Sequence, residues 1–388
     1  MLAAVAIALG AVAAILVLLY HGVAIWFAYR MPRLDPDPPP APGVPPLPSV
    51  RVILAARNEA DAIDRTLDSL LAQDIPLPAI VAVDGGSTDG TRERIDRRAP
   101  RIRRIDEPPL PPGWVGKSWA LHVGAQGATE DWLLFLDADV GLHPAAVRTA
   151  LAWAVRERAD LASLATRVEM VGPWERIVLP LYIQLILTHL RAPDVNRPDS
   201  TAAMANGQFL LVRREAYAAI GGHEAIREQI VEDVALAQRA RAAGMTLRVA
   251  WAPELVSTRM YRDRAEMAEG ILKTVHGTSY SRIRQLGRLV GLIGLFWLPL
   301  GLLPLGVALG SPVLAALGGL LWIALFGKHA AFARAVGARA RDGLAFPVAV
   351  GFYVVLLARS IARGGAGGTV RWKGRDYRLR PPGERATR

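Results

Sequence analysis

Residues 132–140 constrain the fold of this chain more than any other stretch. They read Trp-Leu-Leu-Phe-Leu-Asp-Ala-Asp-Val, an unbroken apolar run that ends in two aspartates separated by one residue. A run of this length and bulk is typical of a strand buried on both faces, as in a parallel sheet covered by helices. Asp137 and Asp139 then lie at the carboxyl end of that strand, where open α/β sheets bind their ligands.

This pair of carboxylates indicates a metal site. Two carboxylates side by side in a partly dry crevice repel each other unless a cation neutralises them. A hard divalent cation that bridges the carboxylates and diphosphate oxygens removes that repulsion. The alternative is a surface loop with two solvated acids, which an isolated Asp-x-Asp usually is. The flanking strand favours the metal at Asp137 and Asp139.

The chain from Val50 to Trp251 alternates segments with strand and helix patterns. Strands are predicted at residues 50–56, 79–84, 102–105, 160–171, 209–213 and 247–251, and along the apolar run that begins at Trp132. Helices are predicted between them, the first of them capped by Asn58 with Asp61 in its first turn. This alternation predicts an α/β fold with a right-handed, mostly parallel, doubly wound sheet.

The acidic residues at the ends of these strands indicate a nucleotide site, although the sequence has neither a dinucleotide-binding motif nor a P-loop motif. Asp84 ends the second strand, so it is expected near Asp137 and Asp139 at the carboxyl edge of the sheet. No Gly-x-Gly-x-x-Gly follows the first strand, and no Walker lysine motif occurs. A dinucleotide site and a P-loop ATP site are therefore not expected.

Apolar residues, 52% of the 388, concentrate at the two ends of the chain. Residues 2–29 carry no charge, are long enough to cross a bilayer, and are followed by Arg30 and Arg33. A cleaved signal peptide has a positive amino-terminal region and a shorter apolar core, so an uncleaved anchor is the better interpretation. The positive-inside rule then places the N-terminus outside and the main domain in the cytoplasm.

The C-terminal part is also membrane-like, at residues 289–309, 312–326 and 345–358. Three crossings there would place the basic tail outside, against the positive-inside rule, so one segment is expected to be re-entrant or interfacial. The sequence leaves open which one. Residues 174–190 are expected to form a buried or interfacial helix. The predicted domains are an anchor (1–30), a proline-rich linker (31–49), an α/β domain (50–285), membrane helices (286–362) and a basic tail (363–388).

Charge and cysteine content exclude several classes of function. The net charge is +11, but the arginines crowd beside apolar stretches, which suits anionic lipid headgroups better than nucleic acid. No basic strand with interleaved aromatics and no recognition helix is apparent, so no nucleic-acid partner is expected. The absence of cysteine excludes disulfides, thiolate zinc sites and a cysteine nucleophile. The histidines show no metal-ligand spacing.

Four ordered motifs resemble those of family 2 glycosyltransferases, which are inverting enzymes with a GT-A nucleotide-sugar fold. They are Ala-Arg-Asn-Glu-Ala (56–60), Val-Asp-Gly-Gly-Ser-Thr-Asp-Gly-Thr (83–91), Asp-Ala-Asp (137–139) and Glu-Asp (232–233). A finer resemblance, to membrane-bound bacterial members associated with carotenoids or hopanoids, rests on residues 113–120, 259–261 and 372–375.

The resemblance implies roles for the donor-side residues. Ala56, Arg57, Glu59 and Asp84 are expected to line the nucleoside pocket, with Asp84 accepting a hydrogen bond from the base. Many members carry a second aspartate where this chain has Gly85, which removes one nucleotide contact. Lys117 lies in a glycine-flanked loop that opens a helix, and its cation is expected to face phosphate, with a solvated lysine as the alternative. Asp139 is expected to be the direct ligand of Mg²⁺ or Mn²⁺. Asp137 would contact the ribose or the metal through water.

The resemblance also implies the acceptor side. Asp233 is expected to be the base that deprotonates the acceptor hydroxyl, with Glu232 beside it; two acids that stabilise a helix N-terminus are the alternative. Gly207 and Gln208 are expected to form the acceptor floor. Arg259 and Tyr261 would contact diphosphate or acceptor, although Tyr261 in the core is an alternative. The Gln-x-x-Arg-Trp of processive synthases is absent, which favours a single transfer.

The sequence thus predicts a multi-pass enzyme of the bacterial inner membrane. It would move one sugar from a nucleotide-sugar donor, most simply a UDP-sugar, to a lipid acceptor at a cytoplasmic active site that uses Mg²⁺ or Mn²⁺. Two alternatives remain open. One is a transferase that acts on a polyprenyl phosphate or a cell-envelope saccharide, and the other is an inactive lipid-binding scaffold with the same fold.

Overall fold

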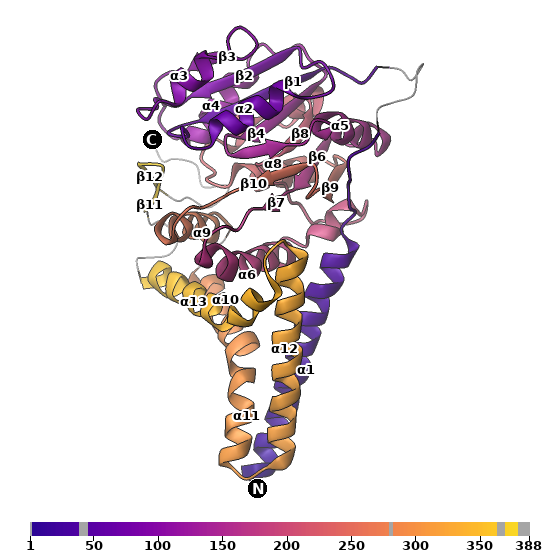
Figure 1. Ribbon diagram of the computed structural model, residues 1–388, viewed down its shortest axis with the longest axis vertical. Helices are drawn as coiled ribbons and strands as arrows, with labels where there is room; N and C mark the ends of the chain where they lie inside the picture. Colours follow the sequence, from indigo (N-terminus) through magenta and orange to yellow (C-terminus); the bar gives the residue numbers. More distant parts are fainter. Residues whose placement is uncertain (1, 39–45, 279–281, 363–368, 379–388) are drawn as a thin grey trace.

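The computed structural model describes residues 2–38, 46–278, 282–362 and 369–378, and shows a sheet domain from which an apolar group of helices projects (Figure 1). The sheet has seven strands in the order β3-β2-β1-β4-β8-β6-β9. Their bounds in that order are Arg103–Asp106, Ala79–Asp84, Val50–Ala56, Trp132–Asp137, Leu210–Arg213, Leu161–Ala165 and Leu247–Trp251.

The sheet is mostly parallel, as predicted. Strand β8 runs antiparallel to both of its neighbours, β4 and β6, and the other pairs are parallel. On either side of β1, Ala56 pairs with Asp84 and Ala55 pairs with Asp137. The two acidic strand ends therefore lie at one edge of the sheet, with β1 between them.

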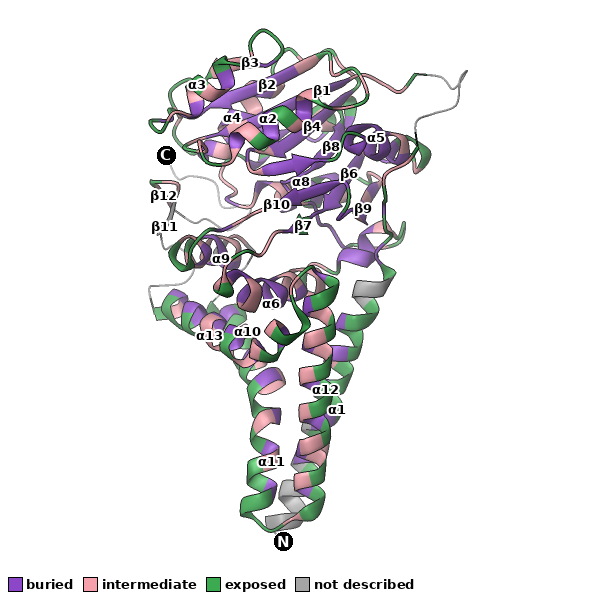
Figure 2. Cartoon of the chain, viewed as in Figure 1, coloured by how far each residue is buried: buried purple, intermediate pink, exposed green. Residues whose placement is uncertain are grey.

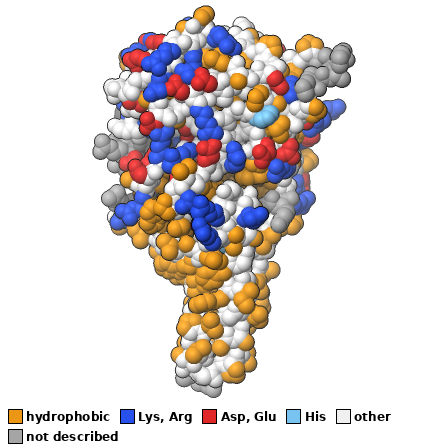
Figure 3. Space-filling view, viewed as in Figure 1, with side chains coloured by type: hydrophobic (Ala, Val, Ile, Leu, Met, Phe, Trp, Pro, Cys, Tyr) orange, Lys and Arg blue, Asp and Glu red, His pale blue; other side chains and the backbone are white. Residues whose placement is uncertain are grey.

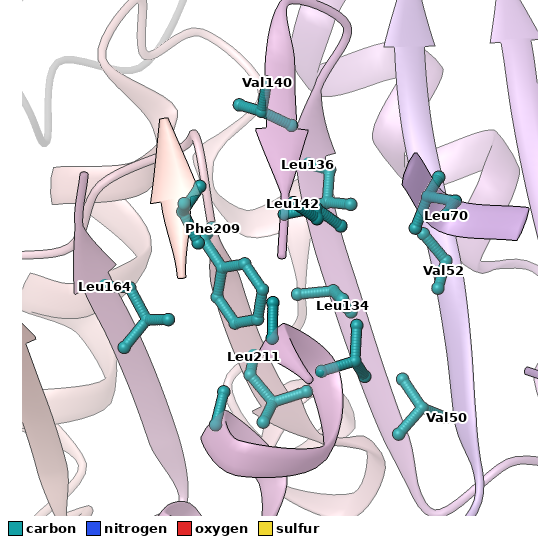
Figure 4. Close-up of a cluster of buried hydrophobic side chains, with 14 of the residues drawn as sticks. Val50, Val52, Leu70, Leu134, Leu136, Val140, Leu142, Leu164, Phe209 and Leu211 are labelled. Carbon is teal, nitrogen blue, oxygen red and sulfur yellow. The ribbon is translucent and has the colours of Figure 1, made fainter. Parts of the chain in front are cut away.

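Helices cover both faces of the sheet. Their bounds are α2 Ile63–Leu71, α3 Thr91–Asp96, α4 Gly116–Ala125, α5 Ala146–Arg156, α7 Arg214–Ala219 and α8 Glu232–Ala242. Alternate residues of the strands enter two different clusters, so α2 and α5 pack on one face, and α4 and α8 on the other. Figure 4 shows the first cluster, in which Leu134 and Leu136 of β4 meet Val52 and Leu70. Each such buried side chain stabilises the fold by about 1.5–3 kcal/mol.

The start of α2 differs from the prediction. Ala62, not Asn58, precedes the helix, and no side chain caps it. Asn58 instead adopts a φ of +53°, which asparagine tolerates better than most residues, and its Oδ1 accepts a hydrogen bond from the N–H of Thr88 at 3.0 Å. The predicted cap is therefore wrong, and Asn58 joins the loop after β1 to the loop after β2.

A second, small sheet was not predicted in this form. It has three strands in the order β5 (Val140–Leu142), β10 (Val256–Thr258) and β7 (Arg167–Val168). The loop that carries Asp137 and Asp139, which we call the acidic loop, begins at the end of β4 and ends at the start of β5. Its two ends are therefore held by two different sheets.

Long apolar helices form the other half of the molecule. The segments are α1 Leu2–Arg30, α10 Arg282–Leu292, a π-helical turn at Ile293–Trp297, α11 Leu298–Ala308, α12 Pro312–Ala335, a 3₁₀ turn at Ala340–Ala345 and α13 Phe346–Ala362. Within the described part of the chain, three continuous helical stretches are long and apolar enough to cross a membrane: 282–308, 312–335 and 340–362. Helices α1, α11 and α12 lie side by side and point away from the sheet domain, and we call them the helical bundle (Figure 1).

Close packing and an apolar exterior characterise the bundle. A Cβ at Gly306 or Gly318 would lie 2.3 Å from backbone atoms of the opposite helix, so glycine allows α11 and α12 to approach closely. Figure 2 shows many exposed residues along the bundle, and Figure 3 shows that its surface is hydrophobic, whereas charged side chains gather on the sheet domain. Among the exposed apolar residues are Ile15, Leu16, Leu305, Leu320 and Ile323.

Helices α6 (Pro173–His189), α9 (Arg264–Thr278) and α13 lie across the junction of the two halves (Figure 1). Helix α13 packs against α6, α9 and α10. The sequence placed a buried or interfacial helix at the position of α6, and the structure has it at this junction.

The predicted proline-rich linker and the predicted basic tail both contain residues that pack against the sheet domain, which the sequence did not predict. Of the proline-rich linker, residues 39–45 lie outside the described residues. The described part packs on the sheet domain, where Leu34 N–H donates to Trp251 O and Arg148 donates to the carbonyls of Asp37 and Pro38. Of the basic tail, residues 363–368 and 379–388 lie outside the described residues. The rest forms a hairpin of β11 (Thr369–Trp372) and β12 (Arg375–Arg378).

Candidate active site

The acidic loop after β4 has the properties of a divalent-metal site. Thr66 Oγ1 lies 2.8 Å from the carbonyl oxygens of Ala138 and Val140, which fixes the loop. Oδ1 of Asp139 is buried and has no hydrogen-bond partner among the described residues. Burial and the neighbouring charges of Asp137 and Glu59 raise the pKa of Asp139 to about 7. An ionised Asp139 therefore needs a cation beside it.

A metal at this loop would need further ligands. Among the described residues, no cluster of three or more His, Asp or Glu side chains is placed to hold an ion. Two carboxylates with the remaining positions left to diphosphate oxygens and water are a usual arrangement for Mg²⁺ in phosphate-binding sites. The residues present thus fit a metal that binds together with a nucleotide.

Lys117 joins this loop to the predicted catalytic pair. It is the second residue of α4, and its Nζ lies 2.5 Å from Asp137 Oδ1 and 2.5 Å from Glu232 Oε1. Burial alone would lower the pKa of Lys117, but Asp137 and Glu232 raise it well above its usual value, so the amine stays charged. The structure does not show the solvated lysine that was the alternative.

Glu232 and Asp233 begin α8 and differ in their charge state. The Glu232 side chain is 3% exposed, and although burial acts to raise its pKa, Lys117 lowers it to about 2. Burial and the charge of Glu232 raise the pKa of Asp233 to about 6. One carboxylate is thus neutralised by Lys117, while the other remains a proton acceptor near neutral pH.

Backbone groups orient the Asp233 carboxylate. Its Oδ2 accepts a hydrogen bond from the N–H of Gly207 at 2.7 Å, and its Oδ1 accepts one from the N–H of Val234 at 2.8 Å. A Cβ at Gly207 would lie 2.9 Å from Lys117 Nζ and 3.3–3.4 Å from the Glu232 and Asp233 carboxylates. Glycine at position 207 is therefore what allows these three charged groups to converge.

Gln208 lies beside this centre but is engaged by its neighbours. It is buried, and its Oε1 accepts hydrogen bonds from Thr166 Oγ1 at 2.5 Å and from Asn206 Nδ2 at 3.0 Å. It lines the apolar cavity described below, so its predicted place in the acceptor floor stays a prediction.

A polar cavity of about 510 Å³ lies in front of the carboxyl edge of the sheet. We call it the donor cavity. Of the predicted donor residues, the ones that line it are Ala56, Arg57, Glu59, Lys117, Asp137, Asp139 and Arg259.

Asp84 is placed differently from the prediction. It is 1% exposed and is not among the described residues that line the donor cavity. Its carboxylate accepts hydrogen bonds from the N–H groups of Gly86 and Ser87 and lies 3.4 Å from Arg92 Nε. In this structure Asp84 therefore shapes the turn after β2, and the contact with the base stays a prediction.

Arg259 and Tyr261 follow β10 and line different cavities: Arg259 lines the donor cavity, and Tyr261 lines a second cavity. Arg259 Nε lies 2.9 Å from Oε1 of Glu175, a carboxylate that is 2% exposed at the start of α6. Tyr261 is buried against Gly270 of α9 and lines the second cavity. Tyr261 thus packs in the core and also faces this cavity, so its predicted contact with the acceptor stays a prediction.

The second cavity is mostly apolar and measures about 660 Å³. We call it the acceptor cavity. Its walls come from α6, α9, α10 and α13, and include Ile183, Leu187, Leu292, Phe296, Tyr353 and Leu357. Asp233 and Glu232 line its polar end. Lys117, Asp137 and Asp139 line both cavities, so the two meet at the charged centre.

The donor cavity also has lining residues that the sequence did not predict, among them residues of the C-terminal hairpin. Lys373, Arg375 and Tyr377 of the C-terminal hairpin line it, together with Glu107 after β3. The motif at residues 372–375 was noted only as a mark of resemblance. Its contacts join residues about 300 positions apart, and no local pattern reveals such contacts.

Comparisons with known proteins agree with this geometry. A sequence model described as "Glycosyl transferase family 2" matches residues 51–221. The 4,4'-diaponeurosporenoate glycosyltransferase of Staphylococcus haemolyticus (strain JCSC1435) is 24% identical over 215 residues, which are 55% of this chain and 57% of that protein. The protein of the same name from Staphylococcus aureus (strain USA300) is 25% identical over 217 residues, with the same coverage. The match thus spans little more than half the length of these curated relatives.

A solved structure shares the fold over nearly the whole chain. It is the mannosyltransferase PcManGT from Pyrobaculum calidifontis, in complex with GDP-Man and Mn²⁺. The TM-score is 0.56 at 21% identity, and the match covers 93% of this chain and 99% of that one. Residues 51–221 thus match the family 2 glycosyltransferase model, the chain shares the fold of a solved mannosyltransferase, and its sequence resembles carotenoid-associated glycosyltransferases.

Proposed function

We propose that this protein is a non-processive inverting glycosyltransferase that moves one sugar from a nucleotide-sugar donor to a membrane lipid. The observation that carries the proposal is the junction of the two cavities. The polar one is suited to a nucleotide diphosphate and the apolar one to a lipid chain, and they meet at Lys117, Asp137 and Asp139. We propose a UDP-sugar as the donor. PcManGT was solved with GDP-Man, so both nucleotides belong in a transfer assay.

The charged centre supports an inverting displacement. For a hydroxyl acceptor, Asp233 takes the proton as the oxygen attacks the anomeric carbon from the side opposite the diphosphate. The N–H groups of Gly207 and Val234 hold the carboxylate in place for this step. Lys117 forms ion pairs with Glu232 and Asp137, so that Asp233 is left as the proton acceptor. Asp139 and Asp137 would hold Mg²⁺ or Mn²⁺, which would neutralise the charge on the leaving diphosphate.

Narrowing the acceptor cavity tests the lipid half of the proposal. Gly291 of α10 lines this cavity, and a Cβ there would meet no atom within 4 Å. Gly291→Phe should therefore place a ring in the cavity and lower kcat/KM for the lipid acceptor by about 10-fold or more. The measurement is transfer of labelled sugar to extracted membrane lipids, with affinity for the donor determined separately.

A matched control lies one turn away on the same helix. Gly287 also has open space around its Cβ position, but it is exposed and does not line the acceptor cavity. Gly287→Phe should leave kcat/KM unchanged. Equal losses in both variants, or none in either, would mean that the apolar cavity does not hold the acceptor.

The position of the C-terminal hairpin supports a membrane topology with α13 at the interface. With the N-terminus outside, α1 brings the chain to the cytoplasm, the helix formed by α10 and α11 leaves it, and α12 returns. A further crossing by α13 would put the hairpin outside. However, Lys373 Nζ lies 3.0 Å from Glu59 Oε1 in the sheet domain. We therefore propose that α13, of the three C-terminal segments, is the one that lies in the membrane interface.

Cysteine labelling tests this topology because the chain contains no cysteine. Leu309 is exposed at the end of α11, and Leu309→Cys should react with a membrane-impermeant maleimide in intact spheroplasts. A cysteine added after Arg388 should react only after permeabilisation. Labelling of the added cysteine in intact spheroplasts would show that α13 crosses the membrane.

A further inference from the structure

The C-terminal hairpin presents basic side chains from an unusual turn. Its two central residues, Lys373 and Gly374, have φ values of +47° and +75°. Two-residue hairpins of this kind favour Asn-Gly, because both positions need a positive φ. A lysine at the first position adopts a conformation that non-glycine residues rarely adopt, and such positions concentrate at functional sites.

The hairpin contacts three loops at the carboxyl edge of the sheet. Besides the pair of Lys373 with Glu59, Arg375 Nη2 lies 3.1 Å from Glu107 Oε2 and 3.4 Å from the carbonyl oxygen of Gly85. The hydroxyl of Tyr377 accepts a hydrogen bond from the N–H of Gly116 at 3.3 Å, at the start of α4. The hairpin thus covers the ends of β1 and β2 and the N-terminus of the helix that carries Lys117.

Glycines let the hairpin approach this closely. A Cβ at Gly116 would lie 2.2 Å from Arg375 Nη1, and a Cβ at Gly85 would lie 3.0 Å from Glu107 Oε2. The absence of a side chain at Gly85 leaves room for the ion pair between Arg375 and Glu107.

The charges of the hairpin balance acids that would otherwise repel a nucleotide. Glu59 and Glu107 line the donor cavity together with Asp137 and Asp139, and a diphosphate adds further negative charge. The Glu107 side chain is 4% exposed, and its Oε1 has no partner among the described residues. Cations placed beside these acids, at the mouth of the same cavity, turn an acidic pocket into one that can accept phosphate.

We infer that the hairpin is part of the donor site, where Lys373 and Arg375 bind the phosphate groups of the nucleoside diphosphate. This inference rests on the proposed function, since it names the chain's own cations that the donor would contact. Lys373 and Arg375 would contact only the phosphate groups of the donor. They should therefore add no affinity for the nucleoside alone. The hairpin would bind with the donor and hold it against Lys117 and the acidic loop.

The experiment compares diphosphate with nucleoside binding in the full-length protein in detergent. Lys373→Ala and Arg375→Ala should each weaken binding of UDP with Mn²⁺ by about 10-fold in calorimetry, whereas the affinity for uridine, measured by competition, stays the same. Lys373→Arg should restore most of the affinity. The control is Arg156→Ala, which removes one exposed positive charge on α5 that lines neither cavity.

The outcomes separate this inference from the function it rests on. Wild-type protein that binds no nucleoside diphosphate would overturn both. Wild-type binding with unchanged affinity in both variants would overturn the hairpin alone, as would an equal loss for UDP and uridine. A measurement on the wild-type protein alone does not depend on whether the variants fold. UDP with Mn²⁺ should protect the bonds after Lys373 and Arg375 of the wild type from trypsin, and uridine should not; equal cleavage with both would contradict the inference.

Discussion

Asp233→Asn should slow sugar transfer by about 10³-fold and leave donor affinity within about twofold of wild type. Asparagine cannot take up the proton of an acceptor hydroxyl. Its one side-chain carbonyl oxygen can still accept a hydrogen bond from the N–H of Gly207, so the loop before β8 keeps its contact with the start of α8, while the NH2 group cannot accept the hydrogen bond that Val234 N–H donates to Asp233. A loss of kcat without a change in donor affinity is the signature of a group that acts in the chemical step.

The measurement is single-turnover transfer to lipid, with UDP affinity from calorimetry. Asp68→Asn is the matched control, because Asp68 is an exposed carboxylate of α2 that lines neither cavity. If Asp233→Asn retains more than about a tenth of the wild-type rate, the assignment of the base is wrong. Glu232→Gln is a poorer test, since it also breaks the pair with Lys117.

The same residue sets the pH dependence. Burial and the charge of Glu232 raise the pKa of Asp233 from its ordinary value to about 6, while Lys117 opposes the rise. Asp233 is therefore mostly ionised at pH 7 and becomes protonated as the pH falls through 6. For wild type, kcat/KM should fall about tenfold per pH unit below that value, because the protonated form cannot act as a base. The residual activity of Asp233→Asn should lack this limb of the profile.

Local patterns in the sequence predicted the central strands well. Apolar runs, interrupted only by Arg51 in β1 and Arg248 in β9, predicted β1, β2 and β9 at their observed bounds, and the run from Trp132 predicted β4. The alternation of strands and helices then fixed the mostly parallel order, and with it the shared edge of Ala56, Asp84 and Asp137. These features depend on residues that are close together in the sequence, and the pattern of apolar and polar residues predicts such local structure.

Features that depend on distant partners could not be read in this way. Strands β5, β7 and β10 have two or three residues each, too few for a period to show. Asn58 has the composition of a helix cap, but a contact with Thr88 of the next loop determines its conformation. The role of the hairpin depends on Glu59 and Glu107, which lie about 300 residues earlier in the chain. The apolar segments at 282–308 and 340–362 have the same mean hydropathy, so composition does not distinguish a crossing helix from an interfacial one.

Asp139→Asn should have opposite effects on ligand binding and on stability. The Mn²⁺-dependent affinity for UDP should fall by about 100-fold or more, because the variant removes a charged ligand of the metal. The metal-free protein should unfold at a higher temperature than wild type. Its buried Asp139 lies near the charges of Asp137 and Glu59, and a neutral amide of the same shape removes this repulsion.

These two readouts together separate a metal ligand from a structural aspartate. A structural aspartate would lose stability on substitution, since its hydrogen bonds would be disturbed, but Oδ1 of Asp139 has no such partner among the described residues. Calorimetry of UDP with and without Mn²⁺, and thermal unfolding in a chelator, provide the measurements, with Asp68→Asn again as control. Tight Mn²⁺-dependent binding by Asp139→Asn would refute the metal assignment. A lower unfolding temperature without metal would show that the protein keeps this carboxylate for its fold.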